Sequence, residues 1–232
     1  RDDEGVPTLR FHSVSFFPKF PRLQMRQWNR YGRRLFSEYL TRYGKPDLVH
    51  AHCLYPAGSF ARELRELHGV PFVVTEHRSA YGHSRIDPHL LRMARDTARA
   101  AARTFAVSPA MCSLLETLLG SDTGEWRPLP NIVSDRFLES PLPAVKDRTN
   151  REVVFLHVSL LTPNKAVDSL IRGFAQAFPD DTGVRLQIGG AGPERSRLQA
   201  LVSALGLSPR VEFLGNLSRD QVLTAMASAD AF

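Results

Sequence analysis

One strand–turn–helix unit, residues 153–168, constrains the fold of this chain more than any other stretch. Val153–Val158 is a run of β-branched, aliphatic and aromatic residues around one histidine, which is typical of a buried strand. Pro163 and Asn164 interrupt the run, and a helical spacing of apolar residues begins near Lys165. A parallel strand that feeds a helix through a short loop brings backbone N–H groups and the helix dipole to the carboxyl edge of a sheet, where they favour an anion. Together with the charge of Lys165, this unit predicts a phosphate or diphosphate site.

Strands and helices alternate in the same manner along the rest of the chain. Short apolar runs predict strands, and segments with apolar residues at helical spacing lie between them. The predicted strands are residues 6–17 (a strand running into an aromatic loop), 46–52, 70–75, 104–107, 126–130, 153–158, 184–188 and 211–214, with another beginning at 229. The predicted helices are residues 22–43, 57–67, 88–103, 109–119, 165–178 and 193–205, and another begins near 219. Ser108 and Ser218 are expected to cap the helices that start at 109 and near 219. Short connections of this kind are typical of parallel α/β sheets.

Residues 139–150 separate two such α/β series. This segment, ESPLPAVKDRTN, is polar, contains prolines and has no period. We therefore predict an α/β fold with two doubly wound domains, 1–138 and 151–232, joined by a linker at 139–150. The chain starts without Met and stops at Phe232 inside a predicted strand, so we expect a fragment in which both domains are incomplete.

The composition favours a cytoplasmic protein. No apolar run approaches the ~20 residues that a membrane span needs, and no signal peptide is recognisable. Two cysteines, Cys53 and Cys112, stand far apart, which favours a reducing compartment over a disulfide framework. The net charge of +6 at pH 7 resides mostly in residues 1–140, and it is compatible with an anionic substrate, an anionic membrane surface or nucleic acid.

The predicted helix at 22–43 carries a basic stripe. Arg22, Arg26, Arg30 and Arg33 recur at helical spacing and share one face. One interpretation is the ordinary solvated face of an amphipathic helix. The other is a patch that makes peripheral contact with anionic lipid on the inner face of the membrane, or that meets an anionic acceptor. The stripe lacks the recognised motifs of nucleic-acid-binding domains, so we expect no nucleic acid partner.

The loop after the predicted strand at 70–75 is the best catalytic candidate in the first domain. It reads EHRSAYGH (76–83), and loops at the carboxyl ends of strands carry ligands in open α/β sheets. Histidines also stand at positions 50 and 52, beside Cys53, but zinc needs about four converging ligands at supporting spacings. Core or cleft histidines are the favoured explanation, and we predict no metal site.

Seven segments of the chain form an ordered set of motifs. They are PDLVHAH (46–52), VPFVVTEH (70–77), FAVSPAM (105–111), PNIVSDRF (130–137), FLHVSLLTPNKAVDSLIRGFAQA (155–177), LQIGGAGPERSRLQAL (186–201) and RVEFLGNLSRDQVLTAMASADAF (210–232). In this order the set resembles the retaining glycosyltransferases of family 4 over nearly the whole chain. The resemblance implies the GT-B fold, in which two Rossmann-like parallel-sheet domains face a cleft.

The resemblance also implies a site for a nucleoside diphosphate sugar, the donor, around residues 153–168. Family members carry an Arg and a Lys there, in a pattern like G-R-x4-K-G, and both cations hold the diphosphate. Lys165 matches the Lys, whereas Ser159, Leu160 and Ala166 stand at the positions of the first Gly, the Arg and the second Gly. Leu cannot make the bidentate phosphate contacts of Arg. This departure leaves open weaker donor binding, another Arg that takes its place, or an inactive protein.

Further site residues follow from the same resemblance. His77 matches a histidine that hydrogen-bonds the donor sugar or phosphate, with an ordinary loop histidine as the alternative. Gly190, Gly192 and Pro193 match a G-x-G-P turn, where the backbone approaches the ligand and a helix beginning at Pro193 adds its dipole. A main-chain contact with the nucleobase is implied for Phe213, Leu214 and Gly215.

The combined expectation is an enzyme of the hexosyltransferase type. It would move a sugar from a nucleoside diphosphate sugar to a hydroxyl of a glycan or lipid-linked acceptor, in polysaccharide or glycolipid biosynthesis, with retention of configuration and no cofactor or essential metal. Electrostatic stabilisation of the leaving diphosphate is then the main catalytic effect. Two alternatives stay open, a nucleotide-sugar epimerase of the same fold and a non-catalytic sugar-nucleotide-binding module.

Overall fold

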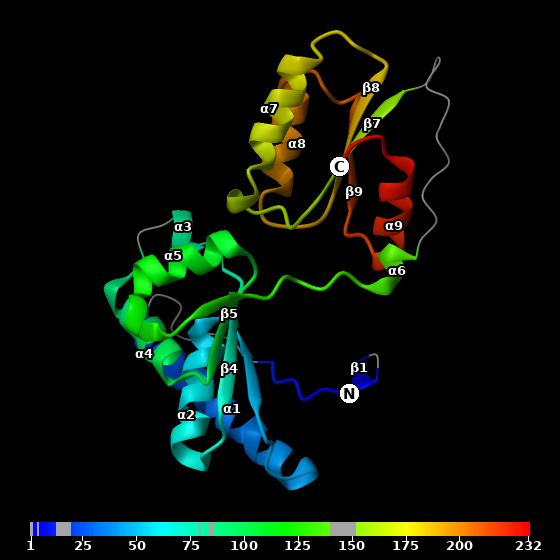
Figure 1. The fold of residues 1–232 in the computed structure, drawn as a ribbon. Helices are drawn as coiled ribbons and strands as arrows, with labels where there is room; N and C mark the ends of the chain where they lie inside the picture. Colours follow the sequence, from blue (N-terminus) through cyan, green and yellow to red (C-terminus); the bar gives the residue numbers. More distant parts are fainter. Residues whose placement is uncertain (1, 4, 13–19, 79, 84–85, 140–151) are drawn as a thin grey trace. The chain divides into compact units, whose positions relative to one another are not determined.

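The computed structural model describes the chain except for residues 1, 4, 13–19, 79, 84–85 and 140–151. The chain divides into two compact units, Arg1–Ile132 (unit 1) and Val133–Phe232 (unit 2). Each unit has its own parallel sheet and its own hydrophobic core (Figure 1). The linker predicted at 139–150 lies outside the described residues apart from Glu139.

Unit 1 is built on a four-stranded parallel sheet with the order β3-β4-β5-β6. The strands are β3 (Val49–His52), β4 (Phe72–Glu76), β5 (Arg103–Ala106) and β6 (Trp126–Pro128). Neighbours in the sheet are also neighbours along the chain, which confirms the parallel α/β arrangement predicted from alternating strands and helices. The carboxyl ends of β3 and β4 lie side by side, because His52 pairs with Thr75 in the register.

Helices cover this sheet and bury a core against it. They are α1 (Pro21–Tyr43), the π-helical turn η1 (Leu54–Gly58), α2 (Ser59–His68), α3 (Ala80–His83), α4 (Pro88–Ala100), α5 (Pro109–Leu119) and the 3-10 turn η2 (Ser121–Thr123). Buried residues such as Leu54, Phe72 and Leu115 form the core. Ser108 caps α5 as predicted, because its hydroxyl accepts a hydrogen bond from the N–H of Met111.

Residues 6–17 were predicted to be a strand that runs into an aromatic loop, and the strand is short. Only Val6–Pro7 (β2) is a strand there, paired antiparallel with β1 (Asp2–Asp3), and residues 8–12 have no regular structure. Residues 13–19 lie outside the described part of the chain. Phe11 instead stacks on Tyr31 of α1, with 4.4 Å between the ring centroids. An aromatic residue that follows the strand therefore packs on a helix.

Unit 2 has a three-stranded parallel sheet with the order β7-β8-β9. The strands are β7 (Val153–Val158), β8 (Val184–Gly189) and β9 (Val211–Gly215), and a parallel bridge joins Phe155 to Ala231, near the strand predicted from 229. The helices are α6 (Asp135–Leu138), the 3-10 turn η3 (Pro163–Lys165), α7 (Val167–Ala177), α8 (Arg195–Ala204) and α9 (Arg219–Ser228). Figure 1 shows α7 and α8 on one side of this sheet and α9 on the other.

Two helices start later than predicted. α7 begins at Val167 rather than near Lys165, because a 3-10 turn comes first and Ala166 then takes a left-handed conformation with φ 48°. α8 begins at Arg195 rather than Pro193, after a turn. In both cases a turn after the strand takes up the residues that were predicted as the start of the helix. The predicted cap at Ser218 is confirmed, and it forms a capping box with Gln221.

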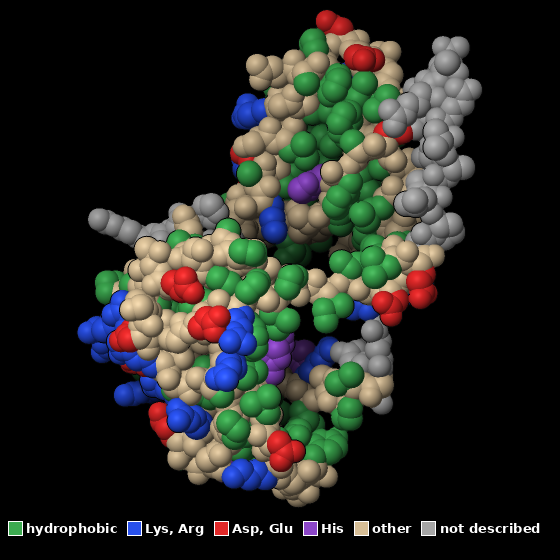
Figure 2. Space-filling view, viewed as in Figure 1, with side chains coloured by type: hydrophobic (Ala, Val, Ile, Leu, Met, Phe, Trp, Pro, Cys, Tyr) green, Lys and Arg blue, Asp and Glu red, His purple; other side chains and the backbone are tan. Residues whose placement is uncertain are grey.

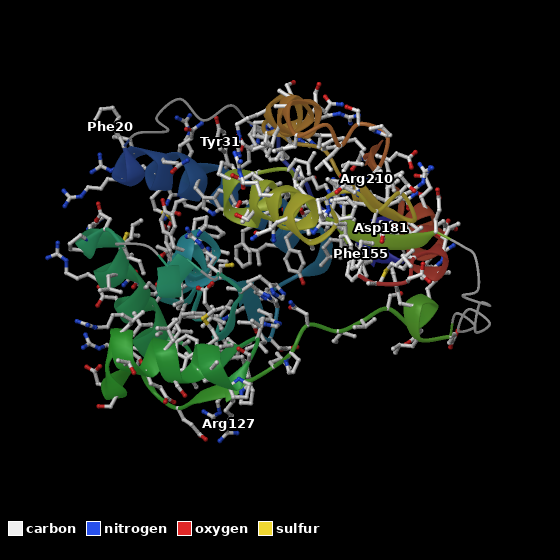
Figure 3. All side chains as sticks on the ribbon, turned by 90° about the horizontal axis from the view of Figure 1, so that it is seen from above. Phe20, Tyr31, Arg127, Phe155, Asp181 and Arg210 are labelled. Atoms are coloured by element: carbon white, nitrogen blue, oxygen red, sulfur yellow. The ribbon has the colours of Figure 1, made fainter. Side chains whose placement is uncertain are left out.

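Arg210 fixes the connection between α7 and β8. Its guanidinium donates to the carbonyl oxygens of Phe178 at 2.6 Å, Asp181 at 2.7 Å and Pro179 at 3.1 Å. It also lies 5.6 Å above the centre of the Phe174 ring. Figure 3 labels Arg210 and Asp181 in this region. The contacts satisfy the carbonyl groups of the C-cap Phe178 and of the loop that follows α7.

Candidate functional site

The carboxyl ends of β7, β8 and β9 meet at one edge of unit 2. A Cβ on Gly190, which follows β8, would lie 1.8 Å from the carbonyl oxygen of Ser159, which follows β7. Gly190 has a φ of 133°, and its N–H donates to the carbonyl oxygen of Gly215 at 2.6 Å. Ser159, Gly190 and Gly215 therefore form a continuous strip across the three strand ends. We call this strip, together with Gly192 and Lys165, the edge site.

Gly192 locks the loops after β7 and β8 together. A Cβ at this position would lie 2.2 Å from the carbonyl oxygen of Leu161. The N–H of Leu161 donates to Ala191 at 2.9 Å, and the N–H of Glu194 donates back to the Leu161 carbonyl at 3.1 Å. The side chain of Leu161 is fully buried beneath these contacts. The G-x-G turn thus has a packing role that the sequence pattern did not reveal.

Ser159 presents its hydroxyl, rather than its amide, to the edge site. Its N–H already donates to the carbonyl oxygen of Gly189 at 3.1 Å. Its Oγ donates to the carbonyl oxygen of Leu160 at 3.1 Å, and Nε2 of His157 lies 2.8 Å from the same Oγ. A hydroxyl has one proton, so the Nε2–H of His157 is the donor in this arrangement. His157 was missed as a site residue, although its place two residues before Ser159 puts both on one face of β7.

Lys165 lies near this pair, at the end of η3. Burial, and next the positive charge of Lys165, lower the pKa of His157 from its ordinary value. The following residue, Ala166, has the left-handed conformation that favours glycine, which is the usual residue at this position of the family pattern. Leu160 is 67% exposed and brings no charge to the site.

Arg195, at the start of α8, brings a second cation to the edge site. Its Nη1 lies 3.5 Å from the position that a Cβ on Gly215 would take, and its side chain is half-buried. Among the residues that the structure describes, none forms an ion pair or hydrogen bond with this guanidinium. Arg197, by contrast, is bound to Glu194 and Asp168. Arg195 was not predicted as a site residue, because only the folded chain brings it to Gly215.

The segment predicted to meet the nucleobase lies at the end of β9. The side chain of Phe213 packs against the core of unit 2, which leaves its main chain for any contact at the edge. Leu214 is half-buried, and Gly215 has a φ of 74° with its carbonyl oxygen bonded to Gly190. A nucleobase contact for these residues stays a prediction.

In unit 1, His77 follows β4 and contacts His52 at the end of β3. Nε2 of His77 lies 2.9 Å from Nδ1 of His52, and Nε2 of His50 lies 2.8 Å from the hydroxyl of Thr75. Burial, and next the charges of His50 and His77, lower the pKa of His52. Strand β3 was predicted to be buried, but His50 and His52 lie on its more exposed face, whereas Ala51 between them is buried. In the described part of the chain, no three His, Cys, Asp or Glu side chains are placed to hold a metal ion.

The carboxylate of Glu76 joins the ends of these two strands. Its Oε1 accepts hydrogen bonds from the N–H groups of His77 and Arg78, both at 2.8 Å, and its Oε2 accepts one from the N–H of Leu54 at 2.9 Å. Glu76 is fully buried. Burial, and next the charge of Glu76, raise the pKa of the Tyr81 phenol. Glu76 therefore fixes the backbone of His77 relative to the end of β3.

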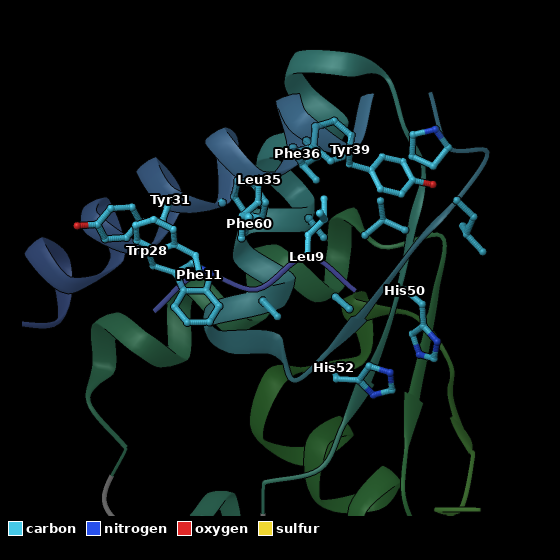
Figure 4. A pocket seen from close by; sticks show the side chains of 18 of the residues that line it. Leu9, Phe11, Trp28, Tyr31, Leu35, Phe36, Tyr39, His50, His52 and Phe60 are labelled. Atoms are coloured by element: carbon cyan, nitrogen blue, oxygen red, sulfur yellow. The ribbon is translucent and has the colours of Figure 1, made fainter. Parts of the chain in front are cut away.

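An apolar cavity of about 830 Å³ in unit 1 extends along β3 to His50 and His52 (Figure 4). Its walls come from residues 9–11, α1, β3 and α2. The aromatic residues in its walls are Phe11, Trp28, Tyr31, Phe36, Tyr39 and Phe60. Figure 2 shows histidine surface and green apolar surface close together on unit 1. The apolar side predicted for the helix at 22–43 therefore lines a cavity.

The basic stripe of α1 is only partly available to an external partner. Arg22, Arg26 and Arg30 are exposed. Arg33 forms an ion pair with Glu63 of α2, so it serves the packing of unit 1. Within the described residues, every helix is too short or too polar to cross a membrane.

The fold and the edge site define a class of protein. Parallel α/β units whose strand ends carry glycine turns, a lysine and helix N-termini are typical of proteins that bind phosphorylated nucleotides. Two family models match the chain, the glycosyl transferase 4-like domain over residues 1–132 and the glycosyl transferases group 1 domain over residues 142–232. The chain therefore belongs to the family 4 type of glycosyltransferases, and its two parallel-sheet units are those of the GT-B fold.

Solved structures share this fold. The lipopolysaccharide outer core galactosyltransferase WaaB is 22% identical with a TM-score of 0.59, over 91% of this chain and 54% of that one. The α,α-trehalose 6-phosphate synthase of Burkholderia multivorans is 16% identical with a TM-score of 0.62, over 90% of this chain and 54% of that one. A structure of S. aureus TarM that contains UDP is 18% identical with a TM-score of 0.57, over 79% of this chain and 36% of that one.

A curated relative adds a sequence match. The exopolysaccharide phosphotransferase SCO2592 of Streptomyces coelicolor is 38% identical over 101 residues, which is 44% of this chain and 10% of that protein. The chain thus spans about half the length of the WaaB and trehalose 6-phosphate synthase structures and a tenth of this relative. At the identities of the solved structures, the likeness shows the fold alone.

Proposed function

We propose that this protein transfers a sugar from a nucleoside diphosphate sugar to an acceptor hydroxyl, with retention of the anomeric configuration. The edge site carries the proposal. Its strip of Ser159, Gly190 and Gly215 is closely packed at the strand ends, with Lys165 beside it, in a chain of the glycosyltransferase family. The bound group that suits this chemistry is the diphosphate of the donor.

Stabilisation of the leaving diphosphate is the main catalytic effect in this proposal. As the bond from the anomeric carbon to the diphosphate oxygen breaks, Lys165 balances the negative charge on that oxygen. The hydroxyl of Ser159 can turn from the Leu160 carbonyl to a phosphate oxygen while His157 continues to donate to it. The acceptor oxygen then bonds to the same face of the sugar and passes its proton to the departing diphosphate.

His77 contributes a hydrogen bond to the donor sugar or phosphate in this proposal. Two contacts support the assignment: Glu76 holds the backbone of His77, and His52 holds its Nε2. Because His52 contacts Nε2 of His77, Nδ1 is the ring nitrogen that can bind the sugar or phosphate of the nucleoside diphosphate sugar. The proposal gives His77 no role as a nucleophile.

The acceptor class is a glycan or a lipid-linked sugar. The name of the S. coelicolor relative, an exopolysaccharide phosphotransferase, supports a polysaccharide context. UDP in the TarM structure supports a nucleoside diphosphate as the leaving group. We further propose action in the cytoplasm, with peripheral membrane contact through Arg22, Arg26 and Arg30, and no requirement for a metal or other cofactor.

Product analysis tests the proposal against its two alternatives. The protein is incubated with nucleoside diphosphate sugars, with and without polysaccharide or lipid-linked acceptors, and the products are followed by NMR. Acceptor-dependent release of the nucleoside diphosphate with a retained anomeric configuration is expected. Release of free sugar without an acceptor would instead identify an epimerase, and binding of the donor without release would identify a non-catalytic module.

A further inference from the structure

The edge site has Leu160 where the family has an arginine, and the structure supplies a substitute. We propose that Arg195 is the second cation that holds the donor diphosphate, together with Lys165. The inference rests on the proposed function, because it assigns a further residue to the same site. Four observations carry it: the position of Arg195, its lack of a partner, the absence of a charge on Leu160 and the distance between the outer strand ends.

A series of contacts connects His157 to Arg195. Nε2 of His157 is 2.8 Å from the Ser159 hydroxyl, and the positive charge of Lys165 acts on the His157 ring. The carbonyl oxygen of Ser159 lies against Gly190, and Gly190 donates to Gly215. The guanidinium of Arg195 then lies against Gly215. One cation thus stands at the β7 end of the strip and the other at the β9 end.

Arg195 has no anionic or carbonyl partner among the described residues, unlike Arg185, Arg197 and Arg210. Arg185 is bonded to Glu152, Arg197 to Glu194, and Arg210 to three carbonyl oxygens. Among the described residues, nothing comparable contacts the guanidinium of Arg195. All five N–H donors of the Arg195 guanidinium are therefore available to a ligand. Their planar arrangement can bind two phosphate oxygens at once. An external anion is the partner that this chemistry fits.

The side chain of Leu160 has no means of filling this role. It is 67% exposed, and it carries neither charge nor donor. The backbone of Leu160 is engaged as well, because its carbonyl oxygen accepts the Ser159 hydroxyl at 3.1 Å. The charge that the family pattern places after β7 therefore has to come from another element, and α8 begins beside the same edge.

The distance across the strip suits a diphosphate. Neighbouring strands lie about 4.8 Å apart, so the ends of β7 and β9 are about 10 Å apart. Lysine and arginine both have long side chains, so a diphosphate bound between them meets one cation from each side. Gly190, in the middle of the strip, and Gly215, at its β9 end, present backbone rather than side chains to the ligand.

Binding of a nucleoside diphosphate tests the role of Arg195. Isothermal titration calorimetry is carried out at one fixed salt concentration with UDP, ADP and GDP, and the tightest binder is the probe. Arg195→Gln is expected to weaken its affinity about tenfold or more, the effect of losing a charged hydrogen-bond donor. Arg197→Gln, on the same helix, is the matched control and should change the affinity less than about twofold, because Arg197 already has intramolecular partners.

Two further variants keep the test decisive. Arg195→Lys preserves the charge and should lose less affinity than Arg195→Gln. Leu160→Arg combined with Arg195→Gln should restore affinity, because it returns the cation to the family position. Circular dichroism verifies that each variant is folded.

The outcomes separate the inference from the proposed function. An unchanged affinity in folded Arg195→Gln, with loss of affinity in Lys165→Ala, would overturn the role of Arg195 and leave the diphosphate site intact. Failure of the wild-type protein to bind any of the three nucleotides would overturn the proposed function, and the inference with it. Loss in both Arg195→Gln and Lys165→Ala, with restoration by Leu160→Arg, supports both.

Discussion

The carbonyl oxygen of Ser159 occupies the space that a side chain on Gly190 would need, because a Cβ there would lie only 1.8 Å from it. Gly190 also has a φ of 133°, which side chains rarely tolerate. We predict that Gly190→Ala destabilises the protein by roughly 2–4 kcal/mol and reduces nucleotide binding, because the loops after β7 and β8 must separate. Urea unfolding and calorimetric titration with UDP measure the two effects.

Gly173→Ala is the matched control for this prediction. Gly173 is exposed within α7, and a Cβ there would meet nothing within 4 Å. Alanine in an exposed helix should leave stability unchanged or raise it by about 0.5–1 kcal/mol. Equal stability of Gly190→Ala and Gly173→Ala would contradict the close packing of the edge site.

Lys165→Ala is predicted to weaken binding of a nucleoside diphosphate by about tenfold or more, because a charged donor to phosphate is lost. The effect should shrink as salt is added, since exposed charges are screened. Affinity measured by titration at two salt concentrations gives both quantities. Lys45→Ala removes the same charge from a loop in unit 1 and should leave the affinity unchanged. Equal effects of the two substitutions would show that Lys165 acts only through net charge.

Glu76→Gln is predicted to destabilise the protein by roughly 2–4 kcal/mol. The carboxylate accepts three backbone N–H groups in a fully buried position, whereas the amide of Gln turns a donor toward at least one of them. Urea unfolding measures the change. Glu66→Gln is the control, because Glu66 is an exposed residue of α2 that is 3.6 Å from Arg62, and surface pairs of this kind contribute little. A stability loss no greater than that of the control would contradict an anchoring role for Glu76.

Much of the fold could be predicted because its signals are local. The apolar run at Val153–Val158 is a strand as predicted, and Ser108 and Ser218 cap helices as predicted. These features depend on a few neighbouring residues. At 6–17 a strand and a following aromatic loop were predicted, but the end of the strand at Pro7 was not, because an aromatic residue such as Phe11 fits a helix surface as well as a sheet.

The edge site was predictable only in part. The sequence pattern located Lys165, Ser159 and Gly190 at the ends of predicted strands, and the structure brings Ser159 and Gly190 together. Arg195 was missed because only the tertiary structure brings it beside Gly215. The contact of His157 with Ser159 is local, and the alternation of side chains along a strand could have indicated it. The left-handed conformation of Ala166 could not be predicted either, because a residue with a Cβ rarely adopts it. The loop between η3 and α7 imposes this conformation.

A final prediction concerns pH. The pKa of His157 is lowered in the folded protein by burial and by Lys165, and the pKa of His52 is lowered by burial and by His50 and His77. As pH falls below about 6.5, the ordinary histidine value, the unfolded chain takes up these protons first. The stability associated with both histidines is therefore complete above about pH 6.5 and is lost as pH falls through their lower folded values.

The variant His157→Gln isolates the contribution of one histidine to this loss. Gln can still donate to Ser159 but does not titrate, so the variant should lose less stability than the wild type between about pH 7.5 and pH 5. The midpoint of urea unfolding, measured at several pH values, gives the comparison. His12→Gln is the control, because His12 is exposed, and it should follow the wild-type curve. Parallel curves for wild type and His157→Gln would mean that His157 takes up its proton equally in both states, and the acid sensitivity would then belong to other groups.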